Sequence, residues 1–264
     1  WYGSAAASEY HDMDWLRAHL GPEEDVGIRS LTNDQTILVL AGPKARHVLS
    51  AAARGDWSAN ALPWLSVREA HIGIAPATVM AVSFSGELAY EIHVPNASLH
   101  AAYTALRTAG AAHGLRLFGS RAVDSMRLEK GFLHWKADIL TEFDPFETGL
   151  ERFVKPDKPD FVGKAALLER MESGPRRKLV TLAIETEAAP ALGGASLRDA
   201  GRIIGTVTSG DWGHRTGLNL AYAFVDAGAA VPGREMTVDI IGARVPARVI
   251  EKGPYDPAHR RMRA

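Results

Sequence analysis

The chain has 264 residues, of which 46% are hydrophobic and 23% are charged, so it can bury a large core. Its 30 Lys and Arg residues nearly balance its 31 Asp and Glu residues, and the formal net charge of -1 gives no general electrostatic reason to bind nucleic acid. The lack of cysteine excludes disulfides, thiolate nucleophiles and cysteine-ligated metals. Any chemistry must therefore use oxygen groups, nitrogen groups or a cofactor.

The sequence shows no apolar run long enough to span a bilayer and no signal peptide. We therefore expect a soluble protein of the cytoplasm, or of the mitochondrial matrix if the source is eukaryotic. The chain opens at Trp1 without an initiator methionine. This opening predicts that an N-terminal part is missing.

The first two thirds of the chain mix helical and strand patterns. Helices are predicted at 4–20, with Ser4 or Ser8 as a cap, from Pro43 onward, at 96–112, and at 120–130 before Gly131. Strands are predicted at 36–41, interpreted as a buried strand, at 76–84 and at 90–94. This order favours an α+β fold over a simple parallel sheet.

The character of the sequence changes near Ser173-Gly-Pro-Arg-Arg. Short β-rich runs follow, at 179–184, 203–208, 220–225, 236–240 and 247–250, separated by Gly, Pro and Asp. They predict a small β-barrel or sandwich. We therefore expect two domains, at 1–174 and 175–264.

Motifs for dinucleotide, P-loop, zincin and α/β-hydrolase sites are absent, and the ten histidines form no metal-ligand cluster. A first candidate segment is 83–95, where Gly86 permits a tight turn that presents Phe84 and Glu91 from two neighbouring strands. A glutamate beside a cavity can accept two hydrogen bonds from a pterin ring while an aromatic packs on its face. The pattern alone favours the alternative, an outward-facing glutamate on an amphipathic hairpin.

Two further segments carry polar residues that core packing does not require. Arg121, Asp124 and Arg127 share one helical face, where a guanidinium can hold a ligand carboxylate. An internal salt bridge of arginine with Asp124 or Glu129 is equally compatible with this spacing. The glycine-rich segment 209–217 is either a loop that closes over a pocket or a long hairpin connection.

Together these segments resemble the glycine-cleavage T-protein (aminomethyltransferase) superfamily across nearly the whole chain. Ser85-Gly-Glu-Leu-Ala-Tyr-Glu-Ile is similar to its T-G-E-x-G-Y-E-I/L hairpin, and Arg121-Ala-Val-Asp-Ser-Met-Arg-Leu-Glu-Lys-Gly resembles its R-A-x-D-S-L-R-L-E-x-G helix. The segments 9–16, 127–138 and 160–167 look most like the C-terminal folate-binding region of dimethylglycine and sarcosine dehydrogenases.

The resemblance implies packed α+β subdomains around a central cavity, followed by a small C-terminal β-barrel. It implies that Glu91 binds the pterin, that Phe84 stacks on or flanks it, and that Arg127 lies near the benzoyl-glutamate side. Tyr90, in the same hairpin motif, is carried over as a fourth cofactor-binding residue. The family's catalytic aspartate is expected upstream of residue 1, so no catalytic residue is assigned and the isolated chain is expected to be inactive without it.

The implied function is tetrahydrofolate-dependent one-carbon transfer. The product would be 5,10-methylenetetrahydrofolate, made from an iminium or formaldehyde unit that oxidative demethylation of dimethylglycine or sarcosine releases. FAD is expected only in an upstream or partner flavoprotein domain, and neither nucleic acid nor membrane is an expected partner. The alternatives are a folate-dependent demethylase, a non-catalytic folate-binding module, and a structural domain that docks to a flavoprotein.

Overall fold

The computed structural model describes residues 1–264, and the chain divides into two compact units. The first unit comprises Trp1–Ser83, Glu87–Arg116 and Met262–Ala264. The second unit comprises Phe84–Gly86 and Leu117–Arg261. No helix of the structure combines the length and the apolar character needed to cross a membrane.

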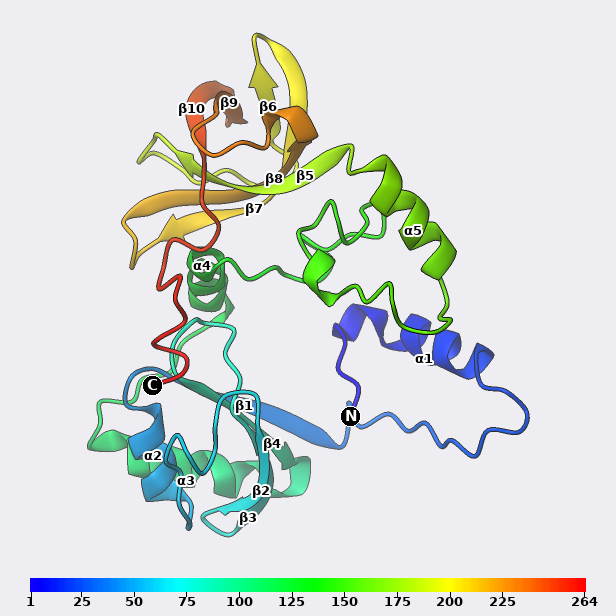
Figure 1. The fold of residues 1–264 in the computed structure, drawn as a ribbon. Coiled ribbons are helices and arrows are strands. Elements are labelled where there is room, and N and C mark those ends of the chain that lie inside the picture. The colour runs from blue at the N-terminus through cyan, green and yellow to red at the C-terminus, as the bar shows by residue number, and fades with distance from the viewer. The chain divides into compact units, whose positions relative to one another are not determined.

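The first unit is built on a four-stranded antiparallel sheet (Figure 1). Its strands are β1 (Gln35–Ala41), β2 (Val67–Ile72), β3 (Ala75–Met80) and β4 (Ala89–Pro95), in the order β1-β4-β3-β2. Side chains alternate along β4, so that Tyr90, Ile92 and Val94 are fully buried on one face. This confirms the apolar side predicted for that strand.

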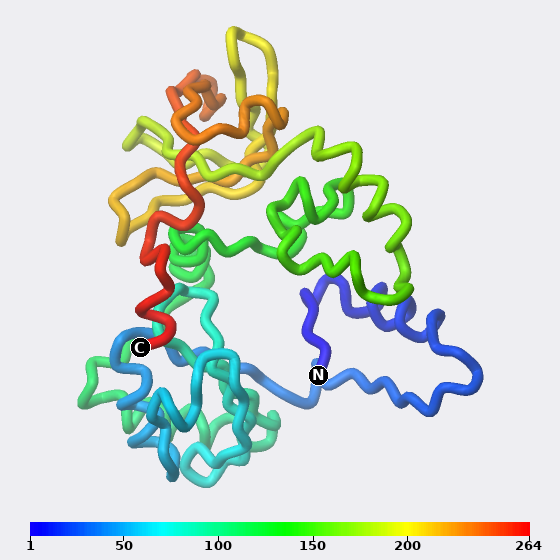
Figure 2. The backbone as a smooth tube through the Cα atoms, viewed as in Figure 1, coloured from blue at the N-terminus to red at the C-terminus, as the bar shows by residue number.

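Two helices cover the buried face of this sheet, α2 (Ala45–Ala52) and α3 (Leu99–Ala111), the latter after the short η2 (Asn96–Ser98). Val48 and Leu49 of α2 and Leu106 of α3 join the strand residues in one hydrophobic core. The helix α1 (Glu9–Ala18), preceded by η1 (Ala6–Ser8), buries none of its own side chains. Figure 2 follows the long connection 19–34 from α1 to β1. The prediction of a helix over 4–20 is thus too long, and Ser8 makes no side-chain capping bond.

The opposite face of the sheet is only partly covered. Because directly paired strand residues share a face, Ile37 and Val39 of β1 lie on the same side as His93 and Glu91 of β4. Ile37 and Val39 are each 50% exposed. The prediction of a buried strand at 36–41 was therefore wrong, because β1 is an edge strand and helices cover only its other face. We call this surface, with Val67 and Met80, the open face.

The connection from β3 to β4 also differs from the prediction. The strand ends at Met80 rather than at residue 84, because Ala81 exchanges main-chain hydrogen bonds with Leu65 and Ser66 instead of with β4. Residues 81–88 then form a longer connection in which Gly86 has a φ of 80°. Phe84 consequently lies outside the sheet, and the expected two-strand presentation of Phe84 and Glu91 was wrong.

The second unit contains a closed six-stranded barrel with the strand order β10-β5-β8-β7-β6-β9 (Figure 1). Its strands are β5 (Arg177–Ile184), β6 (Ser196–Asp199), β7 (Arg202–Gly213), β8 (Leu218–Asp226), β9 (Glu235–Ile240) and β10 (Ala243–Ile250). This unit also holds α4 (Ser120–Lys130), η3 (Glu151–Phe153), α5 (Lys164–Ser173) and η4 (Ala227–Ala229). The predicted α+β class with a C-terminal barrel is confirmed, with β6 added to the five predicted runs.

The helix α4 packs against the barrel strands β7 and β8. It ends at Gly131, whose φ of 84° lets its N–H group bond back to the carbonyl groups of Arg127 and Leu128. The hydroxyl of Tyr222 on β8 donates to the carbonyl oxygen of Leu128 at 2.7 Å. These contacts fix the rotation of α4, and hence the direction in which its arginine points.

Candidate functional site

The first group of predicted site residues lies on β4. The Glu91 side chain is 36% exposed on the open face, and its Oε2 lies 3.4 Å from Nε2 of His93. His93 is 10% exposed, and the ring of Trp1 meets it edge-on at 5.3 Å between centroids. A carboxylate can accept about four hydrogen bonds, so this single contact leaves most of the acceptor capacity of Glu91 unused.

Tyr90 and Glu91 lie on opposite faces of the sheet, as expected for consecutive strand residues. The Tyr90 side chain is fully buried on the core side. The two residues therefore cannot contact one ligand ring from the same side. The assignment of Tyr90 to the cofactor stays a prediction.

Phe84 belongs to the second unit, where it stacks on Phe132. The two rings are nearly parallel, with 5° between their planes and 6.2 Å between their centroids. Phe84 is 38% exposed, so much of its ring is open to another flat group. The packing of Phe84 against a pterin stays a prediction. The exposure of its ring is compatible with that contact.

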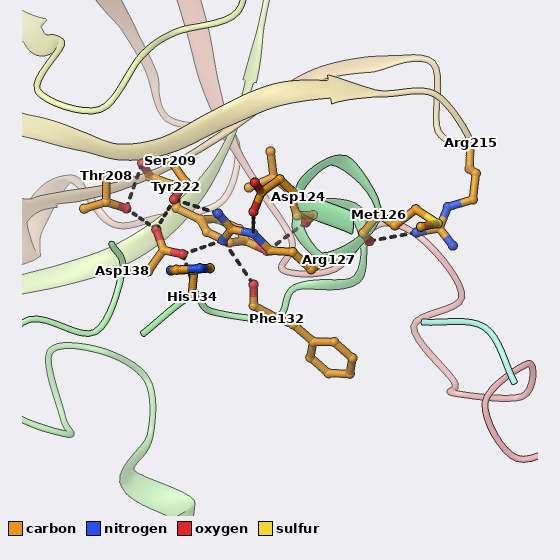
Figure 3. Close-up of polar contacts among 11 residues, drawn as sticks. Asp124, Met126, Arg127, Phe132, His134, Asp138, Thr208, Ser209, Arg215 and Tyr222 are labelled. Atoms are coloured by element: carbon orange, nitrogen blue, oxygen red, sulfur yellow. Dashed lines mark hydrogen bonds and ion pairs between the residues drawn. The ribbon is translucent and has the colours of Figure 1, made fainter. Parts of the chain in front are cut away.

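Arg127 is buried, and its guanidinium is held by protein groups (Figure 3). Nη1 donates to Oδ2 of Asp138 at 2.5 Å and to the carbonyl oxygen of Phe132 at 3.3 Å, and Nη2 donates to Oγ of Ser209 at 2.9 Å. Its Nε lies 3.6 Å from Oδ1 of Asp124. The internal salt-bridge alternative thus describes this arginine, with Asp138 as its nearest acid. Direct contact of Arg127 with a ligand stays a prediction.

Asp138 is the centre of this network and is fully buried. Its Oδ2 also accepts a bond from the main-chain N–H of His134 at 2.8 Å. Its Oδ1 accepts bonds from the hydroxyls of Thr208 at 2.5 Å and Ser209 at 2.6 Å, as Figure 3 shows. A buried carboxylate that accepts this many hydrogen bonds is held in one position. The network therefore ties the loop after α4 to strand β7.

Tyr222 completes the surroundings of the arginine. The guanidinium carbon of Arg127 lies 5.6 Å from the centre of the Tyr222 ring, within the range of a cation–π contact. Burial raises the pKa of the Tyr222 hydroxyl far above its ordinary value, and the charge of Arg127 offsets part of that rise. The hydroxyl therefore stays neutral and donates its hydrogen bond at physiological pH.

The glycine-rich segment proves to be a hairpin connection. Strand β7 continues to Gly213, which pairs with Leu218 at the start of β8. The turn between them is held by Glu129 of α4, whose Oε1 accepts main-chain bonds from Arg215 at 2.6 Å and Thr216 at 2.8 Å. The hairpin alternative is thus the correct one for this segment.

Asp138 is the site residue that sequence reasoning missed. It stands eleven positions after Arg127, beyond the helix end at Gly131, so helical spacing gives no sign of the pairing. Local sequence offers no other signal, because the further partners Thr208 and Ser209 lie 70 and 71 positions away from Asp138 in the chain. No group of three or more metal-ligand side chains occurs in the structure.

Comparison with known proteins places this architecture in a family. Residues 1–158 match the model of the GCVT N-terminal domain, and residues 177–256 match the model of the glycine cleavage T-protein C-terminal barrel domain. The chain therefore belongs to the glycine cleavage T-protein family, and it is an aminomethyltransferase-like chain related to dimethylglycine and sarcosine dehydrogenases. The predicted family resemblance is confirmed.

Three proteins illustrate the relationship. Mitochondrial dimethylglycine dehydrogenase of Mus musculus is 33% identical over 251 residues, which cover 94% of this chain and 29% of that protein. Mitochondrial sarcosine dehydrogenase of Mus musculus is 32% identical over 240 residues, which cover 88% of this chain and 26% of that protein. The crystal structure of aminomethyltransferase T from Bartonella henselae has a TM-score of 0.82 at 26% identity and covers 96% of this chain and 66% of that one. The chain thus spans less than a third of the length of these two dehydrogenases.

Proposed function

We propose that this chain is the tetrahydrofolate-binding part of a longer enzyme that oxidatively demethylates dimethylglycine or sarcosine. The one-carbon unit released as an iminium or as formaldehyde would combine with tetrahydrofolate to give 5,10-methylenetetrahydrofolate. FAD would act in a part of the polypeptide outside this chain or in a partner flavoprotein. Family membership supports this proposal, and the observation that carries it is the placement of Glu91 on the open face.

The surroundings of Glu91 fit a reduced pterin ring. Glu91 faces Val39 of β1 on one side and Met80 of β3 on the other, because both are its direct strand partners. A pterin is a flat ring whose N–H and amino groups lie along one edge. A carboxylate can accept two of those hydrogen bonds, and charge-assisted bonds of this kind are stronger than neutral ones. The flanking apolar side chains can cover the ring face.

Tetrahydrofolate would supply the nucleophilic nitrogen that takes up the one-carbon unit. The contribution we assign to Glu91 is to bind the pterin and to set its orientation. Orientation alone can be worth a large factor, since well-oriented groups reach effective molarities on the order of 10⁵ M or more. Phe84 is proposed to flank the ring, and Arg127 to lie near the benzoyl-glutamate side. Tyr90 has less support, because its side chain lies on the core side of the sheet.

The proposal is tested by measuring tetrahydrofolate affinity of Glu91→Gln in the polypeptide that contains this chain. We expect binding to weaken about 10- to 100-fold, because one charged acceptor is lost. The matched control is Glu235→Gln on β9, an exposed acid that lies outside the first unit. This control should keep its affinity within about twofold.

A turnover assay with formaldehyde and tetrahydrofolate then separates an enzyme from a passive module. Faster condensation than in buffer supports one-carbon transfer. Binding without faster condensation favours the non-catalytic folate-binding module. Methyl transfer to tetrahydrofolate without an amine oxidation step would favour the demethylase. Equal affinity of wild type and Glu91→Gln, or no affinity at all, contradicts the proposed role of Glu91.

A further inference from the structure

His93 stands two residues after Glu91 on β4, so both side chains leave the sheet on the same side. The Nε2 atom of His93 lies 3.4 Å from Oε2 of Glu91, within the range of an ion pair but longer than an ordinary hydrogen bond. This nitrogen is shielded from solvent and has no hydrogen-bond partner. It can therefore act on a bound ligand only through the carboxylate beside it.

The surroundings of His93 hold its ring in place. Its strand partners are Ile37 on β1 and Thr78 on β3, and the ring of Trp1 meets it edge-on. An imidazole side chain also has fewer rotatable bonds than a glutamate, so it loses less freedom when it is held. Because the ring is nearly buried whereas the Glu91 side chain is 36% exposed, His93 is the more fixed member of the pair.

The other acid on this side of the sheet already has a donor. Glu69 on β2 pairs with Thr78, which in turn pairs with His93, so these three side chains share the open face. The Thr78 hydroxyl donates to Oε1 of Glu69 at 2.8 Å. The contact of His93 is with Glu91 instead. Glu91 is therefore the carboxylate that His93 can orient.

The unpaired nitrogen and the partly exposed carboxylate complement each other. A buried polar atom without a partner is costly, and a small rotation of the Glu91 carboxylate would turn the 3.4 Å contact into a hydrogen bond. That bond would fix the plane of the carboxylate and leave its other acceptor positions for a ligand. We propose that His93 is a positioning residue for tetrahydrofolate, whose Nε2–H group orients Glu91 toward the edge of the pterin. This inference rests on the proposed role of Glu91.

Matched substitutions at His93 separate the donor from the ring. In His93→Gln the amide nitrogen can take the place of Nε2 and still donate, whereas in His93→Asn the shorter side chain cannot reach Glu91. Tetrahydrofolate affinity is measured on the polypeptide that contains this chain. We expect His93→Asn to weaken binding about 3- to 10-fold and His93→Gln to stay within about twofold of wild type. His93→Leu, a second variant without a donor, should behave as His93→Asn does.

A double-mutant cycle tests whether His93 acts through Glu91. In a Glu91→Ala background, His93→Asn should cause no further loss of affinity, because no carboxylate is left to orient. A residue with only a structural role would instead cause the same loss in both backgrounds. It would also weaken binding when replaced by glutamine.

The outcomes distinguish this inference from the proposed function. If Glu91→Ala leaves the affinity unchanged, the proposed role of Glu91 fails and this inference fails with it. If Glu91→Ala weakens binding while His93→Asn and His93→Leu bind as wild type does, only the inference fails. Additive losses in the double variant, or equal losses in His93→Gln and His93→Asn, would also overturn it. Failure of both donor-free variants to fold would show a structural role instead.

Discussion

Asp138 and Arg127 form a buried ion pair in which Oδ2 and Nη1 are 2.5 Å apart, with side-chain exposures of 0% and 5%. Removing one member leaves the other charged and buried, which costs far more than the pair contributes. We expect Asp138→Ala to lower the free energy of unfolding by about 3–5 kcal/mol. Urea unfolding measures this difference.

The surface pair Arg29 and Asp34 is the control for that variant. Their side chains are 77% and 50% exposed, so Asp34→Ala should cost about 0–1 kcal/mol. The double replacement Arg127→Met with Asp138→Leu should recover much of the lost stability, because no charge is then left alone. A similar cost for Asp138→Ala and Asp34→Ala would show that the buried pair is not required.

Glu129 is expected to hold the β7–β8 turn. It is fully buried, and its Oε2 accepts a bond from Nε of Arg215 at 2.5 Å in addition to the main-chain bonds of the turn. Glu129→Gln removes the charge and should lower stability by about 2–3 kcal/mol. Faster hydrogen exchange of the Arg215 and Thr216 amides should accompany that loss. Glu235→Gln, on the exposed side of β9, should change neither quantity.

Replacing either of two glycines by alanine should lower stability, for different reasons: at one position only the backbone angle is unfavourable, and at the other a steric clash is added. Both have positive φ, 68° at Gly253 and 86° at Gly233. A methyl group at Gly233 meets open space, but at Gly253 it would lie 2.6 Å from the carbonyl oxygen of Lys130. Gly233→Ala should cost about 1–2 kcal/mol, and Gly253→Ala about 1–3 kcal/mol more because of the overpacking. Equal thermal midpoints for both variants would contradict this.

The buried Tyr222 hydroxyl should make the protein sensitive to alkali. Burial raises its pKa in the folded state, so above about pH 10 the unfolded chain releases this proton while the folded chain keeps it. Its contribution is therefore complete below that pH and is lost as the pH rises further. Tyr222→Phe should show a smaller fall in the urea midpoint between about pH 9 and about pH 11 than wild type. Tyr2→Phe, at a residue 71% exposed, should behave as wild type does.

Local sequence signals were sufficient for some elements. The helix over 120–130 was predicted with its observed ends, because Gly131 is a strong stop and the structure gives it the left-handed conformation that favours glycine. The polar side of β4 was predicted from alternation alone. Both features depend on the nearest neighbours in the chain.

Other elements depend on contacts distant in sequence. Strand β2 has Arg68, Glu69 and His71 among its six residues, and strand β6 has only four residues, so neither resembles a buried strand. Their hydrogen bonds to β3, β7 and β9 decide their conformation. The pairing of Arg127 with Asp138 was missed for the same reason, because an irregular segment joins the two residues and regular spacing therefore gives no sign of their contact. The predicted domain division at 174/175 stays a prediction, as do the cofactor contacts of Phe84, Tyr90, Glu91 and Arg127.

The alternation along β4 also limits how this strand can change during evolution. Inserting or deleting one residue within it would exchange the inward and outward side chains together, so that a carboxylate would enter the core and an aromatic ring would leave it. Single substitutions avoid this, and they should fall into two classes of phenotype that alternate position by position. Saturation mutagenesis of the seven residues Ala89–Pro95 would therefore show an alternation along the strand. Substitutions at inward-facing positions should impair folding, and substitutions at outward-facing positions should impair ligand recognition.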